Sequence, residues 1–167
     1  MGPGDAERIV IKSTWKYRLT LVIIAASAGL IIAMPTAAAL GTAGTVSASQ
    51  ALTLVNQERA KAGCGSLRVV PNLQNPAEQQ SHYQAALDRF GHDGANGSTT
   101  GSRLGGFGYS RWGENVAQAQ SARAAVNFWS HSPIHRANMV NCVFTETGLA
   151  LARSNSGRFY WTQTFGG

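Results

Sequence analysis

Histidine and carboxylate side chains are the groups in this 167-residue sequence that could bind a metal or move a proton. His92 follows a stretch with helical character at 76–90, and His135 lies in the string Ser-Pro-Ile-His-Arg-Ala-Asn. Between them, Glu114 lies in the string Gly-Glu-Asn. Two neutral imidazoles and a carboxylate suit a divalent cation such as zinc, with one coordination position left open for water. We therefore expect His92, Glu114 and His135 to form a site.

Each of these residues also has a structural explanation, which the sequence leaves open. His92 could be a solvated residue at the end of a helix, and His135 could be a structural histidine held by hydrogen bonds. Glu114 could cap backbone N–H groups, because a carboxylate is favourable near a helix N-terminus.

The strings typical of well-known catalytic sites are absent. The sequence contains no His-Glu-x-x-His, no Gly-x-Ser-x-Gly and no Gly-x-x-x-x-Gly-Lys. His131 and His135 are four residues apart, but Pro133 between them argues against one continuous helix face carrying both. Any chemistry would therefore depend on residues that the fold brings together from distant positions.

Cys64 and Cys142 are the two cysteines of the chain. In an exported protein an even pair predicts one disulfide. The bond would join positions 78 residues apart, and loops of that size correspond to a stabilisation of roughly 4–5 kcal/mol. The alternative is a free nucleophilic thiol with a histidine partner.

The first 39 residues are typical of an export leader. Residues 8–18 hold four basic side chains, Leu19–Met34 is almost wholly apolar, and small residues follow Pro35 at two possible cleavage sites. The sixteen residues of this segment reach about 24 Å as a helix, short of the ~30 Å hydrocarbon core, which favours a cleaved signal peptide. An uncleaved anchor is the alternative, and the membrane would then be contacted only through this leader. We expect 40–50 to form a short linker and 51–167 the folded domain.

Charge and composition exclude several classes of protein. From position 40 onward, ten Lys and Arg residues stand against six Asp and Glu residues, a net charge of +4. The basic residues are scattered and form no stripe with interleaved aromatics, so we expect no nucleic-acid partner. A single apolar segment excludes a protein that is mainly embedded in a membrane.

The predicted elements are helices first and strands last. We expect helices at 49–63, at 76–90 with Asn75 as its cap, from the cap Ser121 onward, and from Pro133 to about Asn141. A short extended piece at 67–70 and a long loop at 91–108 lie between them. The stretches 147–151 and 158–165 predict an antiparallel hairpin. This order indicates an α+β fold with an antiparallel sheet.

Several strings occur in an order that resembles a known family. They are Asn-Gln-Glu-Arg at 56–59, Gly-His at 91–92, Gly-Glu-Asn-Val-Ala at 113–117, Ser-Pro-x-His-Arg-Ala-Asn at 132–138, Phe-Thr-Glu-Thr-Gly at 144–148 and Tyr-Trp-Thr-Gln-Thr-Phe-Gly at 160–166. Residues 51–167 are similar to the bacterial branch of the CAP superfamily, which groups cysteine-rich secretory proteins, insect venom antigen 5 and plant pathogenesis-related proteins of group 1. The resemblance implies an α-β-α sandwich with a three-stranded antiparallel sheet, including a strand near 112–119.

The resemblance also implies a cavity lined by two histidines and two acidic residues, able to hold a divalent cation. His92 and His135 match the histidines, and Glu114 matches the first acid. Ser132 stands where animal and plant members have the second acid. Ile134 replaces a small glycine and is expected to narrow the cavity mouth. A lone carboxylate weakens any acid–base pair, because it cannot act on opposite sides of a substrate.

Three functions remain open on the sequence. The first is an exported, non-enzymatic binding module of the cell envelope or extracellular space, whose cavity holds a metal, a lipid or a peptide. The second is a zinc-dependent hydrolase in which His92 and His135 bind the metal and Glu114 activates water. The third is a structural envelope protein whose His/Glu cluster stabilises the fold.

Overall fold

The computed structural model describes residues 37–167, so the predicted leader lies outside this range apart from its last three residues. The helices are α1 (Ala37–Lys61), α2 (Pro71–Leu87), α3 (Thr100–Leu104), α4 (Ala122–His131) and α5 (Pro133–Met139). The strands are β1 (Arg68–Val69), β2 (Trp112–Gln118), β3 (Glu146–Arg153) and β4 (Phe159–Gly166). Two short 3₁₀ turns, Ala95–Gly97 and Gly105–Phe107, flank α3. Within residues 37–167, no helix is both long and apolar enough to cross a membrane.

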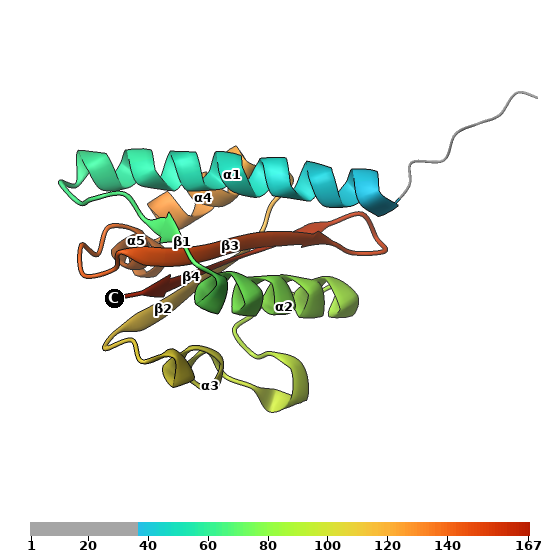
Figure 1. The fold of residues 1–167 in the computed structure, drawn as a ribbon. Helices are drawn as coiled ribbons and strands as arrows, with labels where there is room; N and C mark the ends of the chain where they lie inside the picture. The colour runs from blue at the N-terminus through green and yellow to red at the C-terminus, as the bar shows by residue number, and fades with distance from the viewer. Residues whose placement is uncertain (1–36) are drawn as a thin grey trace, which may run out of the picture. The chain divides into compact units, whose positions relative to one another are not determined.

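The helices cover both faces of one sheet, which confirms the predicted α+β class and the α-β-α sandwich (Figure 1). The strand order is β1-β3-β4-β2. Figure 1 shows α1 and α4 on one side of the sheet and α2 on the other, with α3 beyond α2. β2 is therefore an edge strand, and side chains from both helical layers can reach around it.

The sheet contains one strand more than the resemblance implies. β2, β4 and β3 are antiparallel, as expected, and β2 is the strand expected near 112–119. The additional strand β1 pairs in parallel with β3 through Arg68↔Glu146 and Val69↔Thr147. It ends after two residues because Pro71, which has no N–H to donate to a sheet, starts α2.

The prediction for the start of α2 is wrong by about one turn. The helix begins at Pro71 with Val70 as its N-cap, and Pro76 lies inside it. Pro76 costs a backbone hydrogen bond, but the first turn carries Leu73, which is fully buried against the sheet. Tertiary packing therefore overrides the local signal at Asn75. The helix also ends before Gly91, at Asp88 in the left-handed conformation.

The predicted loop at 91–108 is more ordered than expected, because α3 lies within it. Thr99 caps this helix: its hydroxyl accepts from the Ser102 N–H at 3.2 Å, and the Ser102 hydroxyl accepts from the Thr99 N–H at 2.9 Å. This reciprocal arrangement satisfies two backbone donors at the helix start. α3 is the element that carries Arg103 into the site described below.

The remaining elements agree with the sequence except at the start of α1, where a helix replaces the expected linker. The helix expected at 49–63 is part of α1, which extends toward the N-terminus through the stretch 40–50 that was expected to be a linker. The helices after Ser121 and Ser132 are α4 and α5, and the C-terminal hairpin is β3 and β4.

The two faces of the sheet are packed differently. Toward α1 and α4 the core is apolar and includes Trp129 and Trp161, whose indole N–H groups donate to the carbonyls of Val116 and Ala119. Toward α2 two small apolar clusters lie among many polar contacts. Gln84 donates to the hydroxyl of Thr162 at 2.8 Å. Other hydroxyl and amide groups also lie between α2 and the sheet. The α2 face can therefore support buried polar and charged groups.

Arg59 holds the end of α1 against the segment that follows α5. Its side chain is 1% exposed, and its guanidinium donates at 2.7 to 3.0 Å to the carbonyl oxygens of Gly65, Met139, Asn141 and Phe144. Burial lowers the pKa of Arg59. The Cys64–Cys142 disulfide joins the same two segments. The predicted disulfide is confirmed, and a free thiol nucleophile is excluded.

Replacing Arg59 should destabilise the domain strongly. Arg59→Met should lower the free energy of unfolding by roughly 3 kcal/mol or more, because several buried carbonyl oxygens lose their donor. Lys61→Met is the matched control, since the Lys61 side chain is 70% exposed, and it should cost less than about 0.5 kcal/mol. Urea unfolding followed by tryptophan fluorescence measures both. If both variants lose the same free energy of unfolding, the contact between the end of α1 and the segment after α5 does not depend on the guanidinium.

Candidate functional site

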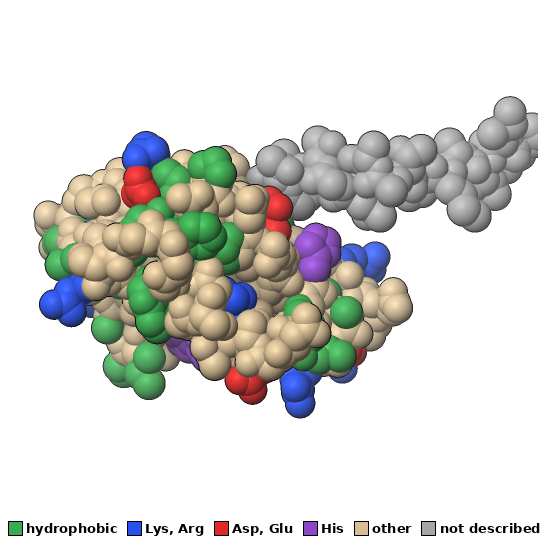
Figure 2. Space-filling model, turned by 60° about the horizontal axis from the view of Figure 1, so that its bottom comes forward, with side chains coloured by type: hydrophobic (Ala, Val, Ile, Leu, Met, Phe, Trp, Pro, Cys, Tyr) green, Lys and Arg blue, Asp and Glu red, His purple; other side chains and the backbone are tan. Residues whose placement is uncertain are grey.

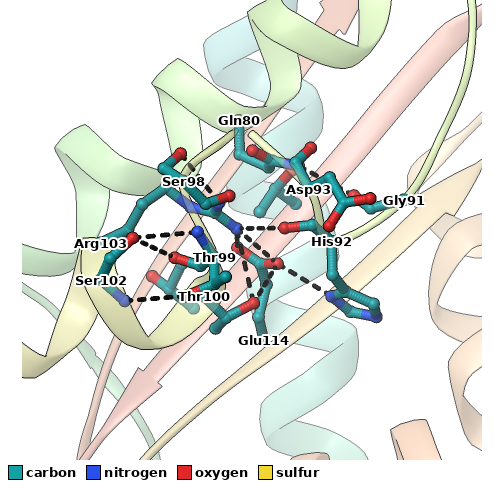
Figure 3. Close-up of polar contacts among 12 residues, drawn as sticks. Gln80, Gly91, His92, Asp93, Ser98, Thr99, Thr100, Ser102, Arg103 and Glu114 are labelled. Atoms are coloured by element: carbon teal, nitrogen blue, oxygen red, sulfur yellow. Dashed lines mark hydrogen bonds and ion pairs between the residues drawn. The ribbon is translucent and has the colours of Figure 1, made fainter. Parts of the chain in front are cut away.

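Glu114 is a buried carboxylate on the edge strand β2 and is 5% exposed. Its two oxygens accept four hydrogen bonds, drawn in Figure 3. One oxygen accepts from His92 Nδ1 at 2.9 Å, the Thr100 hydroxyl at 3.0 Å and Arg103 Nη2 at 2.9 Å. The other accepts from the same Nη2 atom at 2.8 Å. Buried charges are rarely tolerated unless they are paired and hydrogen-bonded, and Glu114 meets both conditions.

Arg103 belongs to this cluster, and the sequence analysis did not identify it. Its side chain is only 8% exposed. Besides Glu114, its guanidinium donates to the Ser98 carbonyl at 3.0 Å and to the His92 carbonyl at 2.9 Å. Arg103 thus fixes both the carboxylate and the backbone that carries His92. The sequence contains no periodic or motif signal for it, since it lies in a stretch of Gly, Ser and Thr.

The backbone before α3 is held from α2 as well. The Gln80 amide donates to the carbonyls of Gly91 and Asp93 at 2.8 and 3.0 Å. Gly94 lies so close to this cluster that a Cβ there would come within 3.0 Å of three side-chain atoms, from Ser98, Arg103 and Gln80. The loop is therefore fixed on both sides of His92.

His135 is placed on the other side of β2 by α5. Its Nδ1 is 2.9 Å from the Ser132 hydroxyl, and its ring packs against Phe128 with centroids 5.3 Å apart. Burial, and to a smaller extent the charge of His92, lowers the pKa of His135. Ser132 therefore orients this imidazole from the position where the second acid was expected. Ile134 is 78% exposed, so it projects into solvent.

Two asparagines connect His135 to the strand that carries Glu114. The Asn138 amide donates to the Asn115 side-chain oxygen at 2.9 Å and to the Glu114 carbonyl at 3.3 Å. In turn, the Asn115 amide donates to the His135 carbonyl at 2.9 Å. These contacts give a physical reason for the two strings. Gly-Glu-Asn supplies Glu114 and Asn115, and Ser-Pro-x-His-Arg-Ala-Asn supplies the His135 and Asn138 that contact them.

The four predicted site residues form two hydrogen-bonded pairs, His92–Glu114 and His135–Ser132. In each pair Nδ1 of the imidazole is hydrogen-bonded, which leaves Nε2 as the ring nitrogen that could bind a ligand. This is the usual arrangement of a metal-binding histidine and its orienting group. Within residues 37–167, however, no three His, Cys, Asp or Glu side chains are grouped so that they could hold a metal ion.

Two open hollows on the surface lie outside this cluster. One has a volume of about 410 Å³ and the other about 300 Å³, and both are lined by Ser130, His131 and Arg136 of α4 and α5. Neither is lined by His92, Glu114 or His135.

Figure 2 shows cationic side chains distributed over the visible face, without one large basic region.

The sequence matches one known family over most of the folded part. The profile of the family described as "CAP: Cysteine-rich secretory protein family" matches residues 52–165. The uncharacterized protein YkwD of Bacillus subtilis (strain 168) is 31% identical over 115 residues, which are 67% of this chain and 44% of that protein.

Solved structures agree in fold. An extracellular protein containing a SCP domain from Bacillus anthracis has 26% identity and a TM-score of 0.69, covering 80% of this chain and 44% of that one. An outer surface protein from Borrelia burgdorferi has 18% identity and a TM-score of 0.64, covering 71% of this chain and 90% of that one. The present chain spans less than half the length of YkwD and of the B. anthracis protein.

Filling the space at Gly94 should disturb the cluster around Glu114. Gly94→Ala should lower the free energy of unfolding by roughly 1–3 kcal/mol, because the new methyl group displaces side chains that hold the carboxylate. Gly106→Ala is the matched control, since no atom lies within 4 Å of a Cβ there. Thermal unfolding of both variants makes the comparison. A Gly94→Ala protein as stable as the control would contradict the close packing described.

Proposed function

Because the chain belongs to the cysteine-rich secretory protein (CAP) family, we propose that it is an exported, non-enzymatic binding module of the cell envelope or extracellular space. Its folded domain includes residues 51–167, and the His92–Glu114 and His135–Ser132 pairs form its binding site. The ligand is a divalent cation, a lipid or a peptide.

Export is supported by the leader-like residues 1–39 and by the disulfide, which is typical of proteins in oxidising compartments. The relative from B. anthracis is described as extracellular. A leader that is cleaved would release the domain, and one that is retained would anchor it to the outer face of the membrane.

The hydrogen bonds of Glu114 carry the non-enzymatic part of the proposal. A general base must offer a free lone pair to water or substrate. One oxygen of Glu114 accepts three hydrogen bonds, and the other accepts one from the buried guanidinium of Arg103, so both oxygens already have donors. These contacts favour a role of the carboxylate in positioning His92 over a role in activating water. This argues against the alternative of a zinc-dependent hydrolase that uses His92, His135 and Glu114.

The residues fit a divalent cation only in part. Nε2 of His92 and Nε2 of His135 are the atoms that would hold it, and zinc at such a position would supply a Lewis acid. Structural zinc sites use four protein ligands and catalytic ones three. A lipid or peptide would instead meet the apolar side chains of Phe128 and Ile134, which are 44% and 78% exposed beside His135.

Export can be tested with the full chain and a variant that lacks residues 2–39. In a bacterial host the full chain should leave the cytoplasm and carry no alkylatable thiol, whereas the shortened variant should remain inside. Cell fractionation, thiol alkylation and mass measurement of the mature N-terminus give the answer. A full chain that stays in the cytoplasm with free Cys64 would contradict the proposal.

Hydrolysis can be tested with zinc present. Wild type, Glu114→Gln and the double variant His92→Ala/His135→Ala should all act on casein and on a p-nitrophenyl ester at the same background rate. The single replacement keeps the size of the side chain and removes its charge. Turnover by the wild type that falls at least about a hundredfold in Glu114→Gln, a typical effect of losing general-base catalysis, would restore the hydrolase.

A further inference from the structure

We infer that Arg103 determines the ligand specificity of the His92–Glu114 cluster, by cancelling the charge of Glu114 and keeping the site from binding divalent cations tightly. This inference rests on the proposed function, because it concerns which ligand the binding site accepts. Arg103 belongs to neither of the histidine pairs and is not among the sequence-predicted site residues.

The first argument is charge. The Glu114 and Arg103 side chains are 1% and 8% exposed, so water screens their interaction little. Together they have no net charge. Within residues 37–167, Glu114 is also the single carboxylate that is hydrogen-bonded to His92 or His135. A dication at these imidazoles would therefore meet no uncompensated negative charge among the groups that contact them.

The second argument is the occupancy of the carboxylate. One carboxylate oxygen of Glu114 already accepts three hydrogen bonds, and the other accepts one from Arg103, so Glu114 can offer a cation at most one oxygen atom. Mg²⁺ and Ca²⁺ need several oxygen ligands, so the cluster should reject them. Ions that favour imidazole, such as zinc, retain two protein ligands, the Nε2 atoms of His92 and His135.

The third argument is that Arg103 is fixed in place. Its guanidinium also donates to the carbonyls of Ser98 and His92. α3, which carries it, is capped reciprocally by Thr99 and Ser102. Moving the guanidinium away to admit a cation would break these hydrogen bonds together with the ion pair, so the neutral state of the cluster is built into the fold.

Zinc titration by calorimetry tests the inference on the full chain in a mild detergent. Arg103→Gln leaves the cluster with one net negative charge and should bind zinc at least roughly tenfold more tightly than wild type, because that charge attracts a dication and water screens it little. Arg103→Lys keeps the charge and should bind like wild type. Arg103→Gln/Glu114→Gln is neutral again and should lose the gain.

The outcomes are distinct. No gain in Arg103→Gln, including the absence of zinc binding in both proteins, overturns the inference, and so does a gain that persists in the double variant. Calcium should give no heat with wild type, and tight calcium binding would also overturn it. Far-UV circular dichroism identifies a variant that does not fold.

A second pair of variants applies if Arg103→Gln does not fold. Ser132→Asp adds a negative charge beside His135 and leaves all contacts of Arg103 in place, and Ser132→Asn is its neutral control. The first should bind zinc at least roughly tenfold more tightly than the second, and equal affinities overturn the inference. None of these titrations measures turnover, so a result here is independent of whether the hydrolysis test supports the proposed function.

Discussion

The arrangement of the site depends on one constraint, the burial of the Glu114 carboxylate on the edge strand of the sheet. A buried charge without partners would cost several kcal/mol, and the segment from His92 to Arg103 supplies those partners. Its turns, its short helix and its reciprocal cap bring an imidazole, a hydroxyl and a guanidinium to the same two oxygens. Most of this segment can be understood as a shell of donors around one anion.

The edge position of β2 explains how residues from both layers become neighbours. Successive side chains of a strand point to opposite faces, so Glu114 faces the α3 layer while Asn115 faces α5. The amide of Asn115 then holds the backbone of His135. The charge of His92 contributes to lowering the pKa of His135, and each imidazole is oriented by a different partner. A central strand, covered by neighbours on both sides, would keep the two layers apart.

Much of this could be predicted from the sequence, and the failures have physical causes. His92, Glu114 and His135 were proposed from their types and strings, and Ser132 from the family resemblance, and the structure shows that they form two hydrogen-bonded pairs. Arg103 was not identified, because its contacts depend on the turns around it. A stretch of Gly, Ser and Thr does not predict the conformation of those turns. The start of α2 was misplaced because Asn75-Pro76 is a strong local signal, while burial of Leu73 against the sheet is a tertiary effect. The cap of α3 could have been found, but Ser102 stands where a longer acidic side chain is usual.

The corner at Arg59 is closed twice, once by the Cys64–Cys142 bond and once by a guanidinium that binds carbonyls on both sides of it. Because there are two links, the geometry of this corner does not depend only on whether the disulfide is oxidised. Reduction removes the covalent link but leaves the hydrogen bonds of Arg59. The two sulfur atoms therefore stay close together, and the disulfide can form again without a large movement of the chain. The corner can therefore keep its shape in surroundings that do not favour disulfides.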